Sequence, residues 1–124
     1  MTTKDALTIK VEVALDEEFL GDILCTAVEG GTNYWAYSAV VERDGLDYKR
    51  VVFEDMEDEE VKIDIDLLAV AKGIERILTN VVPVRSDIRD SIMKGVMEQD
   101  AGFIDADGAD CIVQAAGFND IVYG

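Results

Sequence analysis

A dense run of carboxylates occupies the middle of the chain and restricts what that segment can do in a folded domain. The run holds a single cation, Lys62, and its acidic members are Glu54, Asp55, Glu57, Asp58, Glu59, Glu60, Asp64 and Asp66. Carboxylates at this density repel one another and weaken a compact state. The segment therefore persists either as a solvated loop or because a positively charged partner docks on it.

The chain is acidic overall, yet it has enough apolar residues to form a core. Of its 124 residues, 27 are Asp or Glu and 11 are Lys or Arg, which gives a net charge of -16, and 49% are hydrophobic. This composition predicts a single folded domain over residues 1–124 rather than a disordered chain. The negative excess opposes direct binding to nucleic acid phosphates and to an acidic membrane surface.

The sequence offers few residues for catalysis or metal binding. It contains no histidine, and Cys25 and Cys111 lack the spacing of a metal site or a redox pair. We expect reduced, buried thiols in a protein that is not an enzyme and uses no cofactor and no metal. No apolar run approaches the about 18 residues of a membrane span, and the start of the chain lacks a secretory signal, so we expect a cytoplasmic protein.

Strand patterns occur in four places. Apolar residues alternate with polar ones from Leu7 to Val13, which predicts a first, half-buried strand. Two β-rich runs, Tyr34–Glu42 and Asp47–Glu54, are joined by Asp44-Gly45, a strong hairpin signal. A third run, Val61–Ile65, returns after the acidic loop, so the last three strands should form an antiparallel meander.

Helical periodicity accounts for most of the remaining chain. We expect Asp16 to cap a helix that ends at Gly30-Gly31, and Asp66 to cap a helix over 67–78. Another amphipathic stretch runs from Ser86 to Gln99, after Pro83. The predicted fold class is α+β, with an antiparallel sheet of about four strands and three to four helices packed mainly on one face.

The C-terminal region predicts a short last helix and an anchored tail. Asp107 is the expected N-cap, Asp110 lies in the first turn where a carboxylate favours the helix dipole, and Gly117-Phe118 indicates the end. The apolar segment Ile121–Tyr123 is expected to dock on the core or to pair at a sheet edge.

The carboxylates suggest a docking surface for a basic protein, with a solvated turn as the competing interpretation. The candidate set joins the acidic run to carboxylates near the last helix, and it comprises Glu54, Asp55, Glu57, Asp58, Glu59, Glu60, Asp64, Asp66, Asp105, Asp107 and Asp110. Such a set resembles the closely spaced negative charges of duplex DNA and would compete for a nucleic-acid-binding groove. An acidic protein adapted to salt, without any charged partner, is a third interpretation.

The segment from Asp105 to Asp110 superficially resembles a calcium loop. The pattern of an EF-hand requires glycine at the sixth position and a bidentate Glu at the twelfth, but these positions hold Asp110 and Ala116. Helix capping is the better interpretation, with only a weak, adventitious Ca²⁺ or Mg²⁺ site as the alternative.

The turn from Glu29 to Trp35 has two interpretations. It is either a helix stop followed by aromatic residues that pack on the sheet, or a small polar pocket for a ligand formed by Glu29, Asn33, Tyr34 and Trp35. A pair of glycines carries little specificity, and the spacing of a phosphate loop is absent.

The same turn has the form EGG-x-x-YW, and the chain closes with CIVQAAGFNDIVYG from Cys111 to Gly124. In these two motifs, and in the order of its elements, the chain resembles a family of small acidic phage and prophage proteins, mostly without assigned function. The resemblance implies an accessory or anti-defence factor, a group that includes anti-CRISPR proteins and nucleic-acid mimics, and it supplies no catalytic residues. The acidic stretch after Phe53 and the region of Pro83 depart from the family, so nothing is carried over there.

Together these observations predict a non-enzymatic binder of a basic surface on a nucleic-acid-handling host protein, acting as a phage-encoded inhibitor in the host cytoplasm. The alternatives are a small-ligand binder or minor enzyme that uses the pocket at Glu29–Trp35, and an acidic structural protein without a charged partner.

Overall fold

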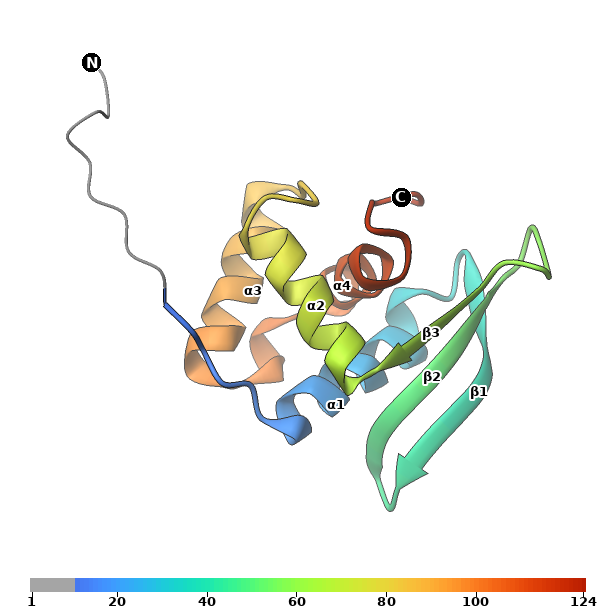
Figure 1. Ribbon diagram of the computed structural model, residues 1–124, viewed down its shortest axis with the longest axis horizontal. Coiled ribbons are helices and arrows are strands. Elements are labelled where there is room, and N and C mark those ends of the chain that lie inside the picture. The colour runs from blue at the N-terminus through green and yellow to red at the C-terminus, as the bar shows by residue number, and fades with distance from the viewer. Residues whose placement is uncertain (1–10) are drawn as a thin grey trace.

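The computed structural model describes residues 11–124 as a three-stranded sheet packed against four helices (Figure 1). The elements in chain order are α1 (Glu17–Thr26), the π-helical turn η1 (Ala27–Gly31), β1 (Ala36–Asp44), β2 (Asp47–Asp55), β3 (Lys62–Asp66), α2 (Leu67–Leu78), α3 (Ser86–Glu98), the 3-10 turn η2 (Ala101–Phe103) and α4 (Ala106–Phe118). The predicted α+β class is confirmed.

The sheet is an antiparallel meander in the order β1-β2-β3. The predicted hairpin is confirmed, but Asp44 pairs with Asp47, so the two loop residues are Gly45 and Leu46 and not Asp44-Gly45. Gly45 has a φ of 64°, which glycine adopts without strain, and a positive φ at the first loop position alone is typical of a type II′ turn. The tip of this hairpin projects beyond the helices (Figure 1).

The prediction of about four strands is not confirmed, because the described part of the chain forms a sheet of three. In the expected first strand, Leu7 and Ile9 lie outside the described residues. Val11 and Val13 lie in irregular chain and are 72% and 45% exposed. A period of two is a local signal, and a strand also needs a free sheet edge whose hydrogen bonds it can complete.

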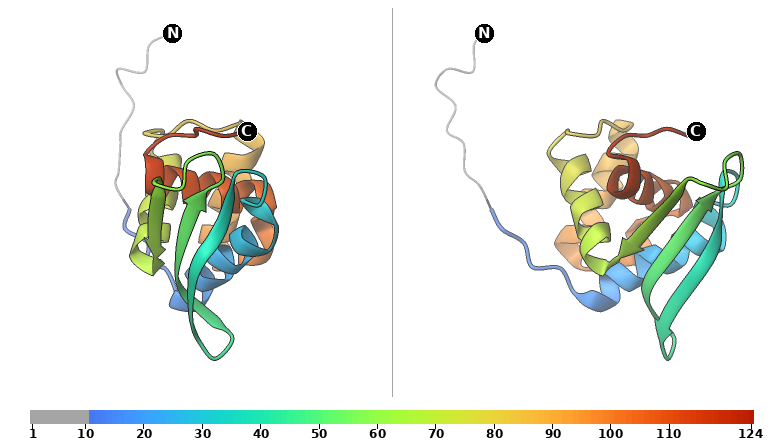
Figure 2. Two further views of the ribbon diagram at one scale, coloured as in Figure 1. Left: turned by 90° about the vertical axis from the view of Figure 1, so that its right-hand side faces the viewer. Right: turned by 45° about the vertical axis from the view of Figure 1, so that its right-hand side comes forward.

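All four helices lie on one face of the sheet, as the sequence predicts (Figure 2). Alternate residues of β2 and β3 point into the core. Three of them, Val51, Phe53 and Ile65, are at most 1% exposed. Helix α4 lies at the centre of the helical layer, against α2, and its Ile112 and Val113 are fully buried. The intervening strand residues, such as Lys62 and Asp64, are exposed on the opposite face of the sheet.

The helix caps agree with the sequence in one case and differ in another. The carboxylate of Asp66 accepts a hydrogen bond from the backbone N–H of Ala69 at 2.8 Å, which confirms the predicted cap of α2. The predicted cap Asp107 is wrong, because α4 begins at Ala106, two residues earlier than that cap implies, and Asp105 accepts from the N–H of Gly108 at 2.9 Å. A sequence with acids at both positions satisfies the capping rule twice, so only the helix start decides between them.

In residues 11–124 no helix is long and apolar enough to cross a membrane.

Candidate functional site

The turn between β2 and β3 presents four consecutive exposed carboxylates, Glu57, Asp58, Glu59 and Glu60, which we call the acidic turn. The turn is ordered by its own side chains. Asp55 accepts a hydrogen bond from the N–H of Glu57 at 2.8 Å, and Asp58 accepts one from the N–H of Glu60 at 3.0 Å. These Asx-type contacts hold the backbone while the remaining carboxylate oxygens face solvent.

Three other carboxylates of the predicted docking set have partners within the chain. Glu54 accepts a hydrogen bond from the hydroxyl of Tyr37 at 2.9 Å. Asp64 receives two hydrogen bonds from the guanidinium of Arg50, at 2.7 and 2.9 Å, and this contact lowers the pKa of Asp64. Asp66 is the cap of α2 and lies at the end of β3 away from the acidic turn, so all three are less free to meet a partner.

Two members of the predicted set, Asp55 and Asp110, are buried and do not lie on a docking surface. Asp55 is 4% exposed and Asp110 is 7% exposed. The sequence places them among exposed acids, but the fold turns them inward and supplies hydrogen-bond donors for both. Of the remaining candidates, Asp105 is the cap of α4, and Asp107 is exposed and forms no ion pair within residues 11–124.

Most cations of the described residues are engaged elsewhere in the chain. Arg50, Lys62, Lys72 and Arg85 pair with carboxylates outside the acidic turn. Others donate to backbone carbonyl groups or lie over aromatic rings, namely Arg76, Arg89, Arg43 and Lys94. No ion pair in residues 11–124 involves the acidic turn, so no cation of this part of the chain neutralises its charge.

Asp110 is the centre of a buried polar network. Its Oδ2 accepts from the hydroxyl of Tyr34 at 2.6 Å. Its Oδ1 accepts from the indole Nε1 of Trp35 at 2.8 Å and from Nε2 of Gln114 at 2.9 Å. Burial and the bond to Asp110 raise the pKa of Tyr34, so the phenol stays a donor. The expectation that Asp110 serves the dipole of α4 is replaced by this tertiary role.

The four residues of the predicted pocket do not meet at one cavity. Trp35 is 3% exposed and stacks on the ring of Tyr123, with centroids 5.1 Å apart, which matches the packing interpretation. Glu29 and Asn33 are exposed and do not line a cavity with Trp35. The turn is needed for close packing, because a Cβ on Gly31 would lie 2.7 Å from the carbonyl oxygen of Ala106.

The C-terminal segment is docked by a side chain that sequence reasoning did not single out. The Oε1 of Gln114, a fully buried residue, accepts from the N–H groups of Val122 and Tyr123, each at 2.8 Å. The hydroxyl of Tyr123 then donates to Oδ2 of Asp55, at the base of the acidic turn. Of the two predicted alternatives, the segment docks on the core. A polar residue in the apolar run of α4 was the available signal.

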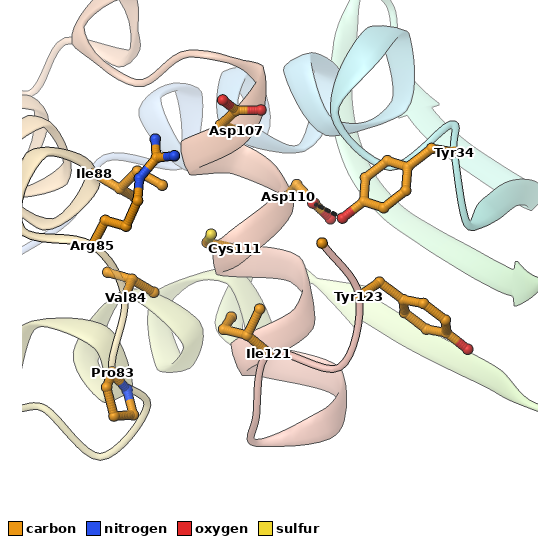
Figure 3. Close-up of a pocket in the computed structure, with 11 residues that line it drawn as sticks. Tyr34, Pro83, Val84, Arg85, Ile88, Asp107, Asp110, Cys111, Ile121 and Tyr123 are labelled. Atoms are coloured by element: carbon orange, nitrogen blue, oxygen red, sulfur yellow. Dashed lines mark hydrogen bonds between the residues drawn. The ribbon is translucent and has the colours of Figure 1, made fainter.

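A cavity of about 360 Å³ lies between α4, the start of α3 and the C-terminal segment (Figure 3). Tyr34, Asp107 and Asp110 line it on one side, Arg85 and Ile88 on the other, and Cys111 lies between them. Further lining residues are Pro83, Val84, Ile121, Tyr123 and Gly124. Tyr34 is thus the one member of the predicted pocket that reaches this cavity.

Both thiols are held in the protonated form, which is the less nucleophilic one. Cys25 and Cys111 are half-buried and unbonded to each other. Burial raises the pKa of Cys111 to about 11, and burial also raises that of Cys25, so both are protonated near neutral pH. Within residues 11–124 no group of three or more Asp, Glu or Cys side chains is arranged to hold a metal ion.

Comparison with protein families, with curated proteins and with solved structures finds no match to this chain. The resemblance to small acidic phage proteins therefore stays a prediction.

Proposed function

We propose that this protein is a non-enzymatic binder that docks its acidic turn on a basic surface of a nucleic-acid-handling protein. The observation that carries the proposal is the set of four exposed carboxylates at Glu57–Glu60, which no cation of residues 11–124 pairs. Uncompensated charge of one sign destabilises a fold, and docking of an opposite charge removes that cost.

The way the turn is held supports docking over a merely solvated loop. Asp55 anchors one end of the turn through Glu57 and through the hydroxyl of Tyr123. Asp55 also donates its backbone N–H to the carbonyl of Val61 at 3.0 Å, which closes the other end. A carboxylate array held by its own backbone contacts loses less conformational entropy on binding than a floppy one.

Competition with nucleic acid is the mode of action we propose. A duplex carries one charge per about 1.7 Å of its axis, and a basic groove that binds it selects closely spaced negative charges. The four consecutive carboxylates of the acidic turn provide such a series. The resemblance to phage proteins favours a phage-encoded inhibitor of a host system, of the anti-CRISPR or nucleic-acid-mimic kind, acting in the host cytoplasm.

A charge-reversed variant tests the proposal directly. Replacing Glu57, Asp58, Glu59 and Glu60 with Lys should abolish capture of a basic partner, because the docking charges are reversed while the fold is kept. The control carries the same change in charge at Asp44, Asp47, Asp90 and Glu98, which are exposed on the hairpin tip, at the start of β2 and on α3.

Partners retained by the wild-type protein from a host extract would be identified, purified and titrated by calorimetry against all three proteins. We expect binding to the wild type and to the control, loss with the turn variant, and displacement by the partner's own nucleic acid. Equal affinity for the turn variant would remove the acidic turn from the interface.

A further inference from the structure

One side chain links the cavity beside α4 to the acidic turn. Tyr123 lines the cavity, and its hydroxyl donates to Asp55 at the base of the turn. Asp55 also accepts from the N–H of Glu57 at 2.8 Å, so the Tyr123 hydroxyl and the acidic turn share this carboxylate. The C-terminal segment and the β2–β3 turn also lie at the same end of the molecule (Figure 1). A protein docked on the turn would therefore lie close to the C-terminal segment that lines the cavity.

The cavity wall contains a buried carboxylate without a counter-ion. Asp110 is 7% exposed, and its donors are a phenol, an indole and an amide, all neutral. Within residues 11–124 it takes part in no ion pair. Buried charges in proteins are normally paired. Its Oδ2 accepts only from Tyr34, so one acceptor position on that oxygen remains.

The field inside the cavity is negative, although Arg85 lines it. Two carboxylates line it, those of Asp110 and Asp107, against the single guanidinium of Arg85. The guanidinium of Arg85 is held by Asp87 through two hydrogen bonds, at 3.2 and 3.3 Å. A positive group that enters would thus meet two carboxylates and one cation that already has a partner.

The remaining walls suit an aliphatic stem. Pro83, Val84, Ile88 and Ile121 supply apolar side chains around the carboxylates (Figure 3). Arginine has three methylene groups and a planar guanidinium that donates along fixed directions, and it is less strongly hydrated than an ammonium. The combination of apolar walls and a carboxylate at the far side matches that side chain better than lysine.

We propose that this cavity is a socket for one arginine side chain of the protein that docks on the acidic turn, with Asp110 and Asp107 as the groups that bind its guanidinium. The inference rests on the proposed function for the source of the arginine. The socket itself can be tested without a partner.

The probe is N-acetyl-arginine amide, titrated into the isotopically labelled protein and followed by the backbone N–H signals of Tyr34, Cys111 and Ile121. N-acetyl-citrulline amide, of almost the same shape but uncharged, is the matched control. We expect saturable shifts at these three residues with the arginine probe, at least about fivefold weaker binding of citrulline, and binding of N-acetyl-lysine amide in between. Equal binding of citrulline, or shifts confined to Glu57–Glu60, would overturn the proposal.

Two variants should change the affinity for the arginine probe in opposite directions. Asp107→Asn removes an exposed carboxylate and should weaken the arginine probe by about threefold to fivefold. Arg85→Gln removes the competing cation and should strengthen it. If Arg85→Gln weakens the probe, or if N-acetyl-glutamate amide binds better than the arginine probe, the cavity is an anion site and the proposal is wrong.

The two proposals fail separately. A partner lost by the charge-reversed turn together with an inactive arginine probe would overturn the socket and leave the docking turn in place. A saturable site that prefers the arginine probe to citrulline, in a protein whose partner binds the turn variant as tightly as the wild type, would support the socket and contradict the turn.

Discussion

Trp35 donates a hydrogen bond from its indole Nε1 to Asp110 at 2.8 Å, across 75 positions of the sequence. Both residues are buried, so the bond gives the indole its acceptor and adds a donor to those that Asp110 has from Tyr34 and Gln114. It ties the residue before β1 to α4, and it joins the bonds from Tyr34 and Gln114 that fix Asp110 at the cavity wall.

Removal of the indole should be strongly destabilising. Trp35→Ala leaves a hole beside Phe118 and Tyr123, and we expect a loss of about 3–5 kcal/mol in the free energy of unfolding. Trp35→Phe keeps an aromatic ring but leaves Asp110 with one donor fewer, at a cost of about 1–3 kcal/mol. Urea unfolding measures both. The exposed Tyr37→Phe is the control and should keep its midpoint, whereas a fully stable Trp35→Phe would contradict a role for the bond.

The stability that Tyr123 contributes should be lost in alkali. Its bond to the carboxylate of Asp55 raises its pKa to about 12, above the ordinary value of 10.0. The neutral phenol is thus favoured by the fold, and its contribution is complete below pH 10 and is lost as the pH rises through 12. Tyr123→Phe should be less stable than the wild type at neutral pH, and the difference should shrink between pH 10 and 12 in urea titrations. A constant difference would show that the bond does not contribute.

The start of α4 can be tested with a matched pair of substitutions. Asp105→Ala removes the cap of Gly108 and should cost about 0.5–2 kcal/mol. Asp107→Ala changes only a carboxylate in the first turn of the helix and should cost less, about 0.3–1 kcal/mol. Thermal unfolding of the two variants, side by side, ranks them. A larger loss of stability for Asp107→Ala would mean that Asp107, and not Asp105, caps α4.

Salt separates charge-driven docking from the alternatives. Attraction between the acidic turn and a basic groove is screened within about 8 Å at physiological ionic strength, so it should act mainly on the association rate. We expect a steep fall of that rate with added salt and a nearly constant dissociation rate, measured by stopped flow with the purified partner. An acidic protein without a charged partner would instead only gain stability with salt. An association rate that stays flat would exclude charge mimicry.

Local signals were sufficient for several elements. Asp44-Gly45 predicts the hairpin because the turn geometry depends on two or three neighbouring residues. Asp66 predicts the start of α2 because a cap reaches only three residues along the chain. The stretch from Ser86 to Gln99 likewise predicts α3, because the helical spacing of its apolar residues depends only on residues within the helix.

Tertiary structure decided which carboxylates are exposed and which are buried. Asp55, Asp58 and Asp110 have the same side chain and comparable acidic neighbourhoods in sequence, yet Asp58 is exposed and the other two are buried. Their donors, Tyr123 for Asp55 and Trp35 for Asp110, lie far away along the chain, so no local pattern reveals them. The sequence by itself determined an acidic α+β domain, because composition and local periodicity are properties of the chain. Which carboxylates face a partner depends on contacts between distant segments, and only the fold brings those segments together.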